Sequence, residues 1–376
     1  MFPKVEITID GNPVAGAFYE RLVEVTITDK TGVKSDTVDI ELNDGPPDYL
    51  AIPRTGALIN VRLGYDQVRS LGQFVVDKVT CKFLPFSMQI GGKSANLRAG
   101  KLKERQERHW DKIKLKAVIS QIASESGLTP AVDPELGDFE YEWLGQQDES
   151  NIHFLHRLED RHNGLFAVKD KRLIFAKRGS ALSASGTFVG SCIVTPDMVV
   201  RGSGSIEFND RTKYSKVVAY YQDSDKAKRV EIDADGDEDG DSVYRIPEPY
   251  ASVSEADTAA RSKVKKLKRG KGDVSVTLIG DTGIAAGSPL LFQGVRPGLD
   301  GVPYVIETAT HKYSKRAGYT TAVSAKLYDG SSAKKASTST DTKADDGKIA
   351  PNTPAGTPAT PPDWVKYQRI GLTDLN

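Results

Sequence analysis

The chain has 376 residues, which is enough for two or three domains that each bury a core of their own. Hydrophobic residues make up 38% and charged residues 27%, and the 51 basic side chains balance the 51 acidic ones, so net charge points to no particular partner. A protein that depends on non-specific phosphate contacts normally carries a basic excess, so nucleic-acid binding as a main function is disfavoured.

Targeting and membrane segments are not expected. The first four residues lead directly into a strand pattern, without the apolar region of a secretory signal. No stretch approaches the roughly 20 consecutive apolar residues that span a bilayer. We therefore expect a protein that is made and folded in the cytoplasm and does not insert into membranes.

The two cysteines, Cys81 and Cys192, each lie in a segment with a strand pattern. Buried thiols are favoured over a disulfide, and two cysteines alone cannot complete a four-ligand zinc site.

Residues 1–97 have the pattern of a β domain. Apolar and polar residues alternate over short runs separated by turn residues such as Asp10-Gly11-Asn12-Pro13, which is typical of half-buried strands. A small barrel or sandwich is predicted, with strands at residues 5–9, 22–28, 37–42, 58–63 and 74–83.

Residues 98–200 are predicted to form an α+β domain. Between Trp110 and Gly127 the apolar spacing becomes helical, and Gly127 sits where a helix-ending glycine belongs. A second helix opens near residues 148–150, where acidic residues suit the positive end of the helix dipole, and stops at Asn163-Gly164. A hairpin at residues 165–176 follows. The inward-facing residues are Leu115, Val118, Ile119, Ile122 and Ala123 in the first helix and Ile152, Leu155 and Leu158 in the second.

Residues 201–330 are predicted to form a second β-barrel domain with one helix. Strands are expected at 216–221 and 229–232, a helix at 254–269, and further strands from 274 to 327. Residues 331–376 are rich in Ser, Thr, Lys, Ala, Asp and Pro, which bury too little apolar surface to offset the entropy of ordering. This tail is expected to be extended and mobile, or ordered only by a partner.

One internal similarity links the two β domains. Gly56, Gly64 and residues 72–79 recur as Gly287, Gly294 and residues 301–308. The alternative is that two all-β domains share hairpin patterns by chance.

No catalytic or cofactor motif is present. Gly92-Lys93-Ser94 resembles the end of a phosphate loop, but the glycine required five residues earlier is Ser87, and no helix follows. There is no Gly-x-Ser-x-Gly elbow, and with 51 carboxylates no acid–base pair can be singled out. We predict no catalytic residue and no cofactor.

Two groups of residues are candidates for metal binding. His153, His156 and His162 lie on or beside the second helix, but no glutamate completes a His-Glu-x-x-His motif, so solvated or capping histidines are favoured. Residues 233–241 form an acidic loop with candidate ligands at Asp235, Asp237 and Asp239. Counting from Asp235, the twelfth position is Ile246 instead of the glutamate of a calcium loop, so a solvated hairpin tip is favoured over a weak calcium site.

A basic run ends the third predicted helix. Its residues follow Ser254, Glu255 and Asp257 at the helix start, which is the charge order that the helix dipole favours. No aromatic residues are interleaved, so a role in helix stability and solubility is favoured over phosphate binding. The run comprises Lys263, Lys265, Lys266, Lys268, Arg269 and Lys271.

The order of segments over most of residues 35–328 resembles the phage late-control gene D proteins, a family of tail hubs that is also similar to the amino-terminal part of type VI secretion spike proteins. The chain departs from the family pattern at Asn151, where that pattern has an aspartate. This departure puts only a cap or a surface contact in doubt. The matching segments are residues 36–42, 56–65, 72–77, 110–128, 147–158 ending at Gly164, 286–287 through 300–301 to 304–305 and His311, and 318–321.

The resemblance implies an α+β, mainly β fold with two tube-protein-like β-barrel domains, an intervening α+β domain and a flexible carboxy-terminal tail. It implies a structural protein of a contractile phage tail, a homotrimer that joins the six-fold tail tube to the three-fold central spike, without catalytic residues. Expected partners are the tail tube or a tube-initiator protein, a separately encoded spike and other baseplate wedge proteins, with DNA only as cargo passing through the bore. The expected location is the virion tail baseplate, assembled in the bacterial cytoplasm.

Alternatives remain open. The chain could be the spike base of a type VI-like injection system or, less favoured because no nucleophile stands out, a tail-associated cell-wall hydrolase. An apolar cluster of Trp364, Tyr367 and Ile370 follows about 30 residues of linker, so these residues are candidates for a tethered docking segment.

Overall fold

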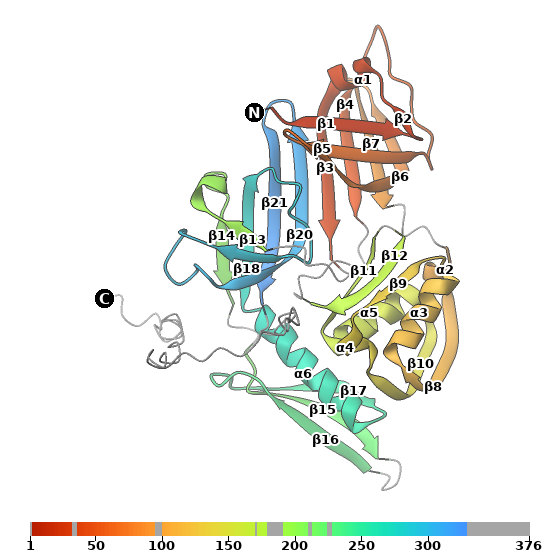
Figure 1. The fold of residues 1–376 in the computed structure, drawn as a ribbon, viewed down its shortest axis with the longest axis vertical. Helices are drawn as coiled ribbons and strands as arrows, with labels where there is room; N and C mark the ends of the chain where they lie inside the picture. Colours follow the sequence, from red (N-terminus) through yellow and green to blue (C-terminus); the bar gives the residue numbers. More distant parts are fainter. Residues whose placement is uncertain are drawn as a thin grey trace, which may run out of the picture.

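The computed structural model shows a mainly β protein with two β modules, a mixed insert and a smaller side unit (Figure 1). The α+β, mainly β fold class is therefore confirmed. The described part of the chain comprises residues 2–31, 36–94, 100–169, 171–178, 191–209, 213–223 and 228–328.

The first module forms one end of the molecule, at the top of Figure 1. Its strands alternate as predicted: in β4, Val38, Ile40 and Leu42 are fully buried while their neighbours are not. These inward side chains form one core beneath the sheet. The elements are β1 (Lys4–Ile9), β2 (Asn12–Pro13), α1 (Gly16–Arg21), β3 (Leu22–Lys30), β4 (Thr37–Asn43), β5 (Leu58–Gly64), β6 (Val68–Lys82) and β7 (Ser87–Ser94).

The insert has a separate core in which α3 and α5 pack between two small sheets. All the helical residues predicted to face inward are buried. The elements are α2 (Gly100–Lys103), β8 (Arg105–Lys114), α3 (Leu115–Glu125), β9 (Thr129–Val132), α4 (Pro134–Gly137), β10 (Glu140–Ser150), α5 (Asn151–His162), β11 (Gly164–Lys169) and β12 (Arg172–Lys177).

The predicted start of the first insert helix is wrong, whereas the predicted limits of the second are correct. The first helix begins only at Leu115, because Trp110 belongs to β8 and pairs with Leu144 of β10. The second runs as expected: the Ser150 hydroxyl accepts a hydrogen bond from the His153 amide, and Asn163 ends the helix in a left-handed conformation.

The second module continues the sheet of the first, so that both belong to one 13-stranded sheet. Its core is separate from that of the first module. Its elements are β13 (Cys192–Val194), the 3-10 turn η2 (Pro196–Met198), β14 (Ser205–Phe208), β18 (Gly272–Ile279), β19 (Pro289–Phe292), β20 (Pro303–Ser314) and β21 (Gly318–Leu327).

Between β14 and β18 the chain forms the side unit, in which a long helix covers a three-stranded sheet (Figure 1). Ala256, Ala260 and Val264 of the helix pack on Val217 and Ala219 of the sheet. The strand β17 was not predicted. The elements are β15 (Lys216–Asp223), β16 (Lys228–Asp235), β17 (Val243–Tyr250) and α6 (Val253–Arg269).

Both cysteines lie in strands, as predicted, and both are free thiols. Cys192 is partly buried, but Cys81 is exposed, so the prediction of a buried thiol is wrong there. The second half of β6 has a paired strand on one side only, which leaves Cys81 without cover. No helix within the described ranges is long and apolar enough to cross a membrane.

Candidate functional site

The two leading glycines of the sequence repeat have the same local structure in both modules, but the strand that follows is equivalent with Val76 at Ile306, one residue on from the predicted match of residues 72–79 with 301–308. Gly56 and Gly287 have left-handed φ values of 89° and 88°. The Gly56 amide donates to the Val76 carbonyl and the Gly287 amide to the Ile306 carbonyl, both at 2.8 Å. In return, the Val76 amide donates to the Ala57 carbonyl at 2.9 Å, and the Ile306 amide donates to the Ser288 carbonyl at 3.0 Å. The shared pattern is therefore a structural equivalence and not a chance likeness of turns.

The equivalence extends to the order of strands. The first module is ordered β3-β4-β7-β6-β5-β1, and the second is ordered β14-β18-β21-β20 and then β19 and β13. The modules differ at the last strand, since β1 is antiparallel to β5 whereas β13 is parallel to β19. Two copies of one sheet arrangement thus stand in a single chain.

The modules meet at a strand junction between β20 and β3, which pair antiparallel over seven residues from Thr308 to Ser314. The Lys312 ammonium pairs with the Glu24 carboxylate across this junction at 2.8 Å. The Asp29 carboxylate accepts a hydrogen bond from the Ala286 amide at 2.8 Å. The junction is therefore a continuous, hydrogen-bonded sheet that fixes one module against the other.

His311 of β20 lies inside this junction and is 2% exposed. Its Nδ1 lies 2.8 Å from the Tyr319 hydroxyl and its Nε2 lies 3.1 Å from the Ile284 carbonyl oxygen. Burial lowers the pKa of His311 below its ordinary value. The buried ring therefore links Tyr319 of β21 to Ile284 in the loop between β18 and β19, which makes it a structural element next to the junction.

The insert contains a polar network around Arg108, which the sequence did not point to. Its guanidinium donates to the Glu125 carboxylate at 2.8 Å, to Gln146 Oε1 at 2.9 Å and to Asn151 Oδ1 at 2.9 Å. Asn151 is fully buried and donates through Nδ2 to the Lys101 carbonyl at 3.0 Å. The expectation that Asn151 affects only a cap or a surface contact is therefore wrong, because its amide supplies a donor that an aspartate lacks.

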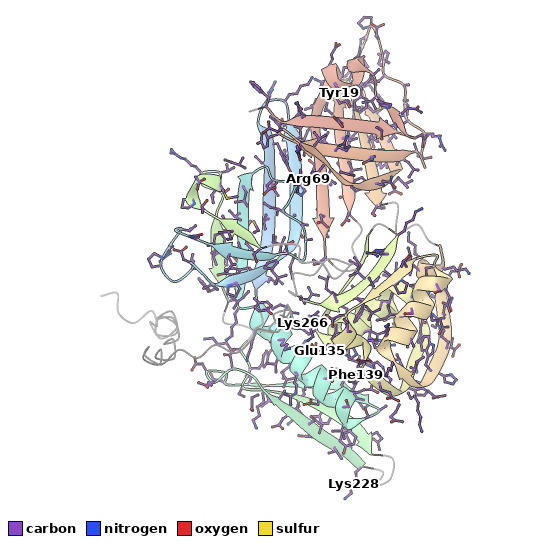
Figure 2. The ribbon with its side chains drawn as sticks, in the orientation of Figure 1. Tyr19, Arg69, Glu135, Phe139, Lys228 and Lys266 are labelled. Atoms are coloured by element: carbon purple, nitrogen blue, oxygen red, sulfur yellow. The ribbon has the colours of Figure 1, made fainter. Side chains whose placement is uncertain are left out.

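A second network joins the insert to the side unit. Glu159 of α5 is 1% exposed and accepts from Arg178 at 2.5 Å. Arg161 of α5 lies 3.4 Å from Glu255 of α6, whose pKa is raised by burial. Lys266 of α6, labelled in Figure 2, pairs with Asp160 at 2.8 Å. The Arg161–Glu255 and Lys266–Asp160 pairs hold α6 against α5, whereas Arg178 and Glu159 both lie in the insert.

The three candidate metal-binding histidines are not brought together. His153 and His156 lie on the exposed face of α5, and a hydrogen bond from His156 to Glu159 raises the pKa of His156. His162 is buried against the Tyr141 hydroxyl at 2.5 Å, and burial lowers its pKa to about 3. The prediction of a solvated or capping role is wrong for His162, because α5 directs it into the insert core.

The acidic residues 233–241 do not form a hairpin tip. The segment crosses from β16 to β17, which lie on opposite sides of β15. Gly236 and Gly240 permit this crossing, since a Cβ would lie 2.1 Å from a Tyr214 backbone atom at the first and 2.4 Å at the second. Asp237 pairs with Lys271. Within the described part of the chain, no three His, Cys, Asp or Glu side chains, those of Asp235, Asp237 and Asp239 included, come together where they could hold a metal ion.

Two further sequence motifs, the phosphate-loop-like residues and the basic run, contact neighbouring side chains of the fold. Gly92-Lys93-Ser94 lies in β7, and Lys93 pairs with Asp77 at 2.6 Å. Lys263, in the basic run, lies 4.2 Å from the centre of the Tyr244 ring. Trp364, Tyr367 and Ile370 lie outside the described residues.

Comparisons with known proteins agree on one family. A family model described as phage tail baseplate hub (GPD) matches residues 94–317, which is more than half of the chain. The probable baseplate hub protein of Escherichia phage P2 is 27% identical over 361 residues, covering 85% of this chain and 92% of that protein. The probable baseplate hub protein of Escherichia phage 186 is 28% identical over 360 residues, covering 85% and 91%.

Solved structures show the same fold. A 43 kDa tail protein of prophage MuSo2 from Shewanella oneidensis has a TM-score of 0.66 at 15% identity, covering 87% of this chain and 99% of that chain. An Escherichia coli component of the type VI secretion system, described as structurally similar to bacteriophage T4 tail proteins, has a TM-score of 0.51 at 13% identity, covering 86% and 76%. Because the family match spans the insert and most of the second module, the chain belongs to the phage tail baseplate hub (GPD) family and is a structural component of the virion tail, not an enzyme.

Proposed function

We propose that this baseplate hub is a homotrimer that joins the six-fold tail tube of a contractile tail to the three-fold central spike. The observation that carries the proposal is the equivalence of the two modules, from the Gly56 and Gly287 hairpins to the order of the strands. Three chains with two equivalent modules each present six similar faces around one axis, while the inserts and side units keep three-fold symmetry. A three-fold object can then dock on a six-fold tube.

In this proposal the ring of modules contacts the tail tube or a tube-initiator protein on one side. The spike and the baseplate wedge proteins attach to the other parts of the trimer, and DNA passes through the bore only as cargo. Residues around Trp364, Tyr367 and Ile370 act as a tethered segment that docks on a neighbour.

The experiment is a mass measurement of the intact chain in solution by native mass spectrometry, combined with electron micrographs of the same sample. We expect a species of three times 40.9 kDa and ring views with six similar lobes. A chain that stays monomeric at all concentrations and joins neither tube nor spike would contradict the proposal.

A second candidate, the spike base of a type VI-like injection system, is supported by the fold that the chain shares with the Escherichia coli secretion component. The two candidates differ in the neighbours of the ring. Purification of assembled particles distinguishes them, because a phage hub is recovered with tail proteins and a secretion hub with secretion-system proteins.

A further inference from the structure

Several strand edges of the sheet, those of β2 and β13 included, have no paired strand among the described residues, and two of them are related by the repeat of the modules. β14 is the terminal strand at the end of the second module. β6 pairs with β5 only up to Val75, so that its second half, from Lys78 to Lys82, pairs with β7 alone. Unpaired edges offer backbone donors and acceptors to another strand.

Inside the chain, the equivalents of these two edges are paired with each other. Val76 of β6 and Ile306 of β20 are equivalent, because each accepts the hydrogen bond from the leading glycine of its module. In both strands a bulge follows directly after this residue. Counting on from the bulge, Val79, Cys81 and Lys82 correspond to Ala309, His311 and Lys312. This half of β20 is the part that β3 covers.

β14 is the equivalent of β3 by the same argument. In each module a row of four residues, each paired with the next on the neighbouring strand, leads from β3 or β14 to the equivalent residues Val76 and Ile306. Ile206 of β14 therefore corresponds to Ile27 of β3. The two rows of paired residues are Ile27, Val38, Gly92 and Val76 in the first module and Ile206, Val274, Ala325 and Ile306 in the second.

We propose that β14 of one copy of the chain pairs antiparallel with the second half of β6 of the next copy, repeating between subunits the β20–β3 junction within one chain. This inference rests on the trimeric hub proposed above and adds the interface and its register. His311 pairs with Ile27 and Ala309 with Asp29 within the chain. The equivalent pairs between chains are Cys81 with Ile206, Val79 with Phe208, Thr80 with Glu207 and Lys82 with Ser205.

The exposure of the side chains fits a missing neighbour. Ala309 and His311 are buried under the junction, at 0% and 2% exposure. The equivalent of His311 in the first module, Cys81, is exposed, and the next residue on that face, Phe83, is 78% exposed. Phe208 on β14 is 70% exposed. In the proposed register these apolar side chains meet on one face, which removes them from water.

The charges on the opposite face are complementary. Lys82 is equivalent to Lys312, which pairs diagonally with Glu24 across the chain's own junction at 2.8 Å, but the equivalent of Glu24 in β14's chain segment is Ser203, so the acidic partner of Lys82 comes from the other diagonal. In the proposed register Glu207 lies opposite Thr80 and therefore diagonal to both Lys78 and Lys82. Diagonal neighbours on adjacent strands are within reach of long charged side chains.

The contact joins two different edges, so it is heterologous and extends from copy to copy until the rotation closes the ring. With one β20–β3 junction inside each chain and one β6–β14 junction between chains, the sheet would run without interruption around all six modules of a trimer. The junction within the chain therefore indicates that the open edges of β6 and β14 are each paired with a second copy of this chain.

The test is a disulfide between subunits in the intact full-length protein. Cys81 is already present, and Ile206→Cys adds its proposed partner, because directly opposite residues on antiparallel strands lie within disulfide reach. Mild oxidation should give covalent dimers and trimers on a non-reducing gel and no larger species. The control is Ile279→Cys, an exposed residue at the end of β18, which should give no such ladder.

A charge exchange tests the register independently. Lys82→Glu and Glu207→Lys should each weaken the trimer by about two- to fivefold per interface, and the double variant should recover much of the loss. If native mass spectrometry shows a trimer but the Ile206→Cys variant crosslinks no better than the Ile279→Cys variant, the proposed junction is overturned and the trimeric hub stands. A chain that is always monomeric overturns both.

Discussion

Gly56 and Gly287, 231 positions apart, have the same φ to within about one degree, 89° and 88°, and each closes the same hairpin with a 2.8 Å hydrogen bond. A positive φ is costly for any residue with a Cβ. Both modules therefore require glycine at the same point, which is why the repeat is visible in the sequence.

Gly287→Ala should lower the free energy of unfolding by about 1–2 kcal/mol. The added Cβ would find no atom closer than 3.8 Å, so the cost comes from the backbone and not from a clash. Urea denaturation measures it. Gly272→Ala, at a strand position without a positive φ and with its nearest contact at 3.5 Å, is the control and should cost clearly less. Equal losses for the two variants would contradict the backbone argument.

Arg178→Ala should destabilise the protein by about 3–5 kcal/mol, because it removes the guanidinium from a carboxylate, that of Glu159, which is 1% exposed. The control is Arg105→Ala, whose partner Asp148 is exposed and whose loss should cost at most about 1 kcal/mol. Thermal unfolding of both variants gives the comparison. If Glu159 tolerates the loss as well as Asp148 does, the pair does not compensate a buried charge.

Stability should fall below about pH 6.5, the ordinary pKa of histidine, because the pKa of buried His162 is lowered to about 3. The unfolded chain then binds a proton that the folded chain does not. The contribution of His162 is therefore complete above about pH 6.5 and is lost as the pH falls toward about 3, with a slope of at most about 1.4 kcal/mol per pH unit. His162→Gln, which keeps a polar partner for Tyr141, should flatten this part of the stability curve.

His156→Gln is the matched variant for the pH experiment and should act in the opposite direction. The pKa of His156 is raised by Glu159, so its stabilising contribution is present below the unfolded pKa and is lost as the pH rises through the folded value. Unfolding curves recorded from about pH 4 to 8 separate the two histidines. The same slope change in both variants would show that neither assignment is correct.

Replacing Trp364 and Tyr367 together by alanine should leave the trimer intact and weaken its attachment to spike or baseplate by about tenfold or more, because buried aromatic anchors carry much of the energy of an interface. Co-sedimentation with assembled tails measures attachment, and Gln368→Ala in the same segment is the control. The docking idea is wrong if deletion of everything after Asp329 changes neither trimer formation nor attachment.

Local patterns determined a large part of the fold. Alternation in Val38, Ile40 and Leu42 predicted β4, and the spacing of Leu115 to Ala123 predicted the buried face of α3. These predictions succeed because strand and helix periods are set by nearby backbone geometry. Trp110 was assigned to the wrong element because a strand running directly into a helix leaves no turn residue between them.

The chemistry of single positions was harder to predict. The sequence contains no sign that His162 is buried, that Asn151 completes the Arg108 network or that Glu159 is enclosed by Arg178. Each depends on which residues from distant parts of the chain surround it. β17 was missed because its proline-containing segment lacks the usual strand pattern and is stabilised by pairing with β15.

The sequence by itself determined that the chain contains two related β modules, since the glycines and the alternating apolar residues that define them are local requirements of the backbone. Only the tertiary structure decided that β20 pairs with β3, and therefore which edges remain open at β6 and β14. The reason is physical: strand pairing uses backbone groups that every residue possesses, so the choice of partner is made by the packing of whole sheets and leaves little trace in the order of side chains.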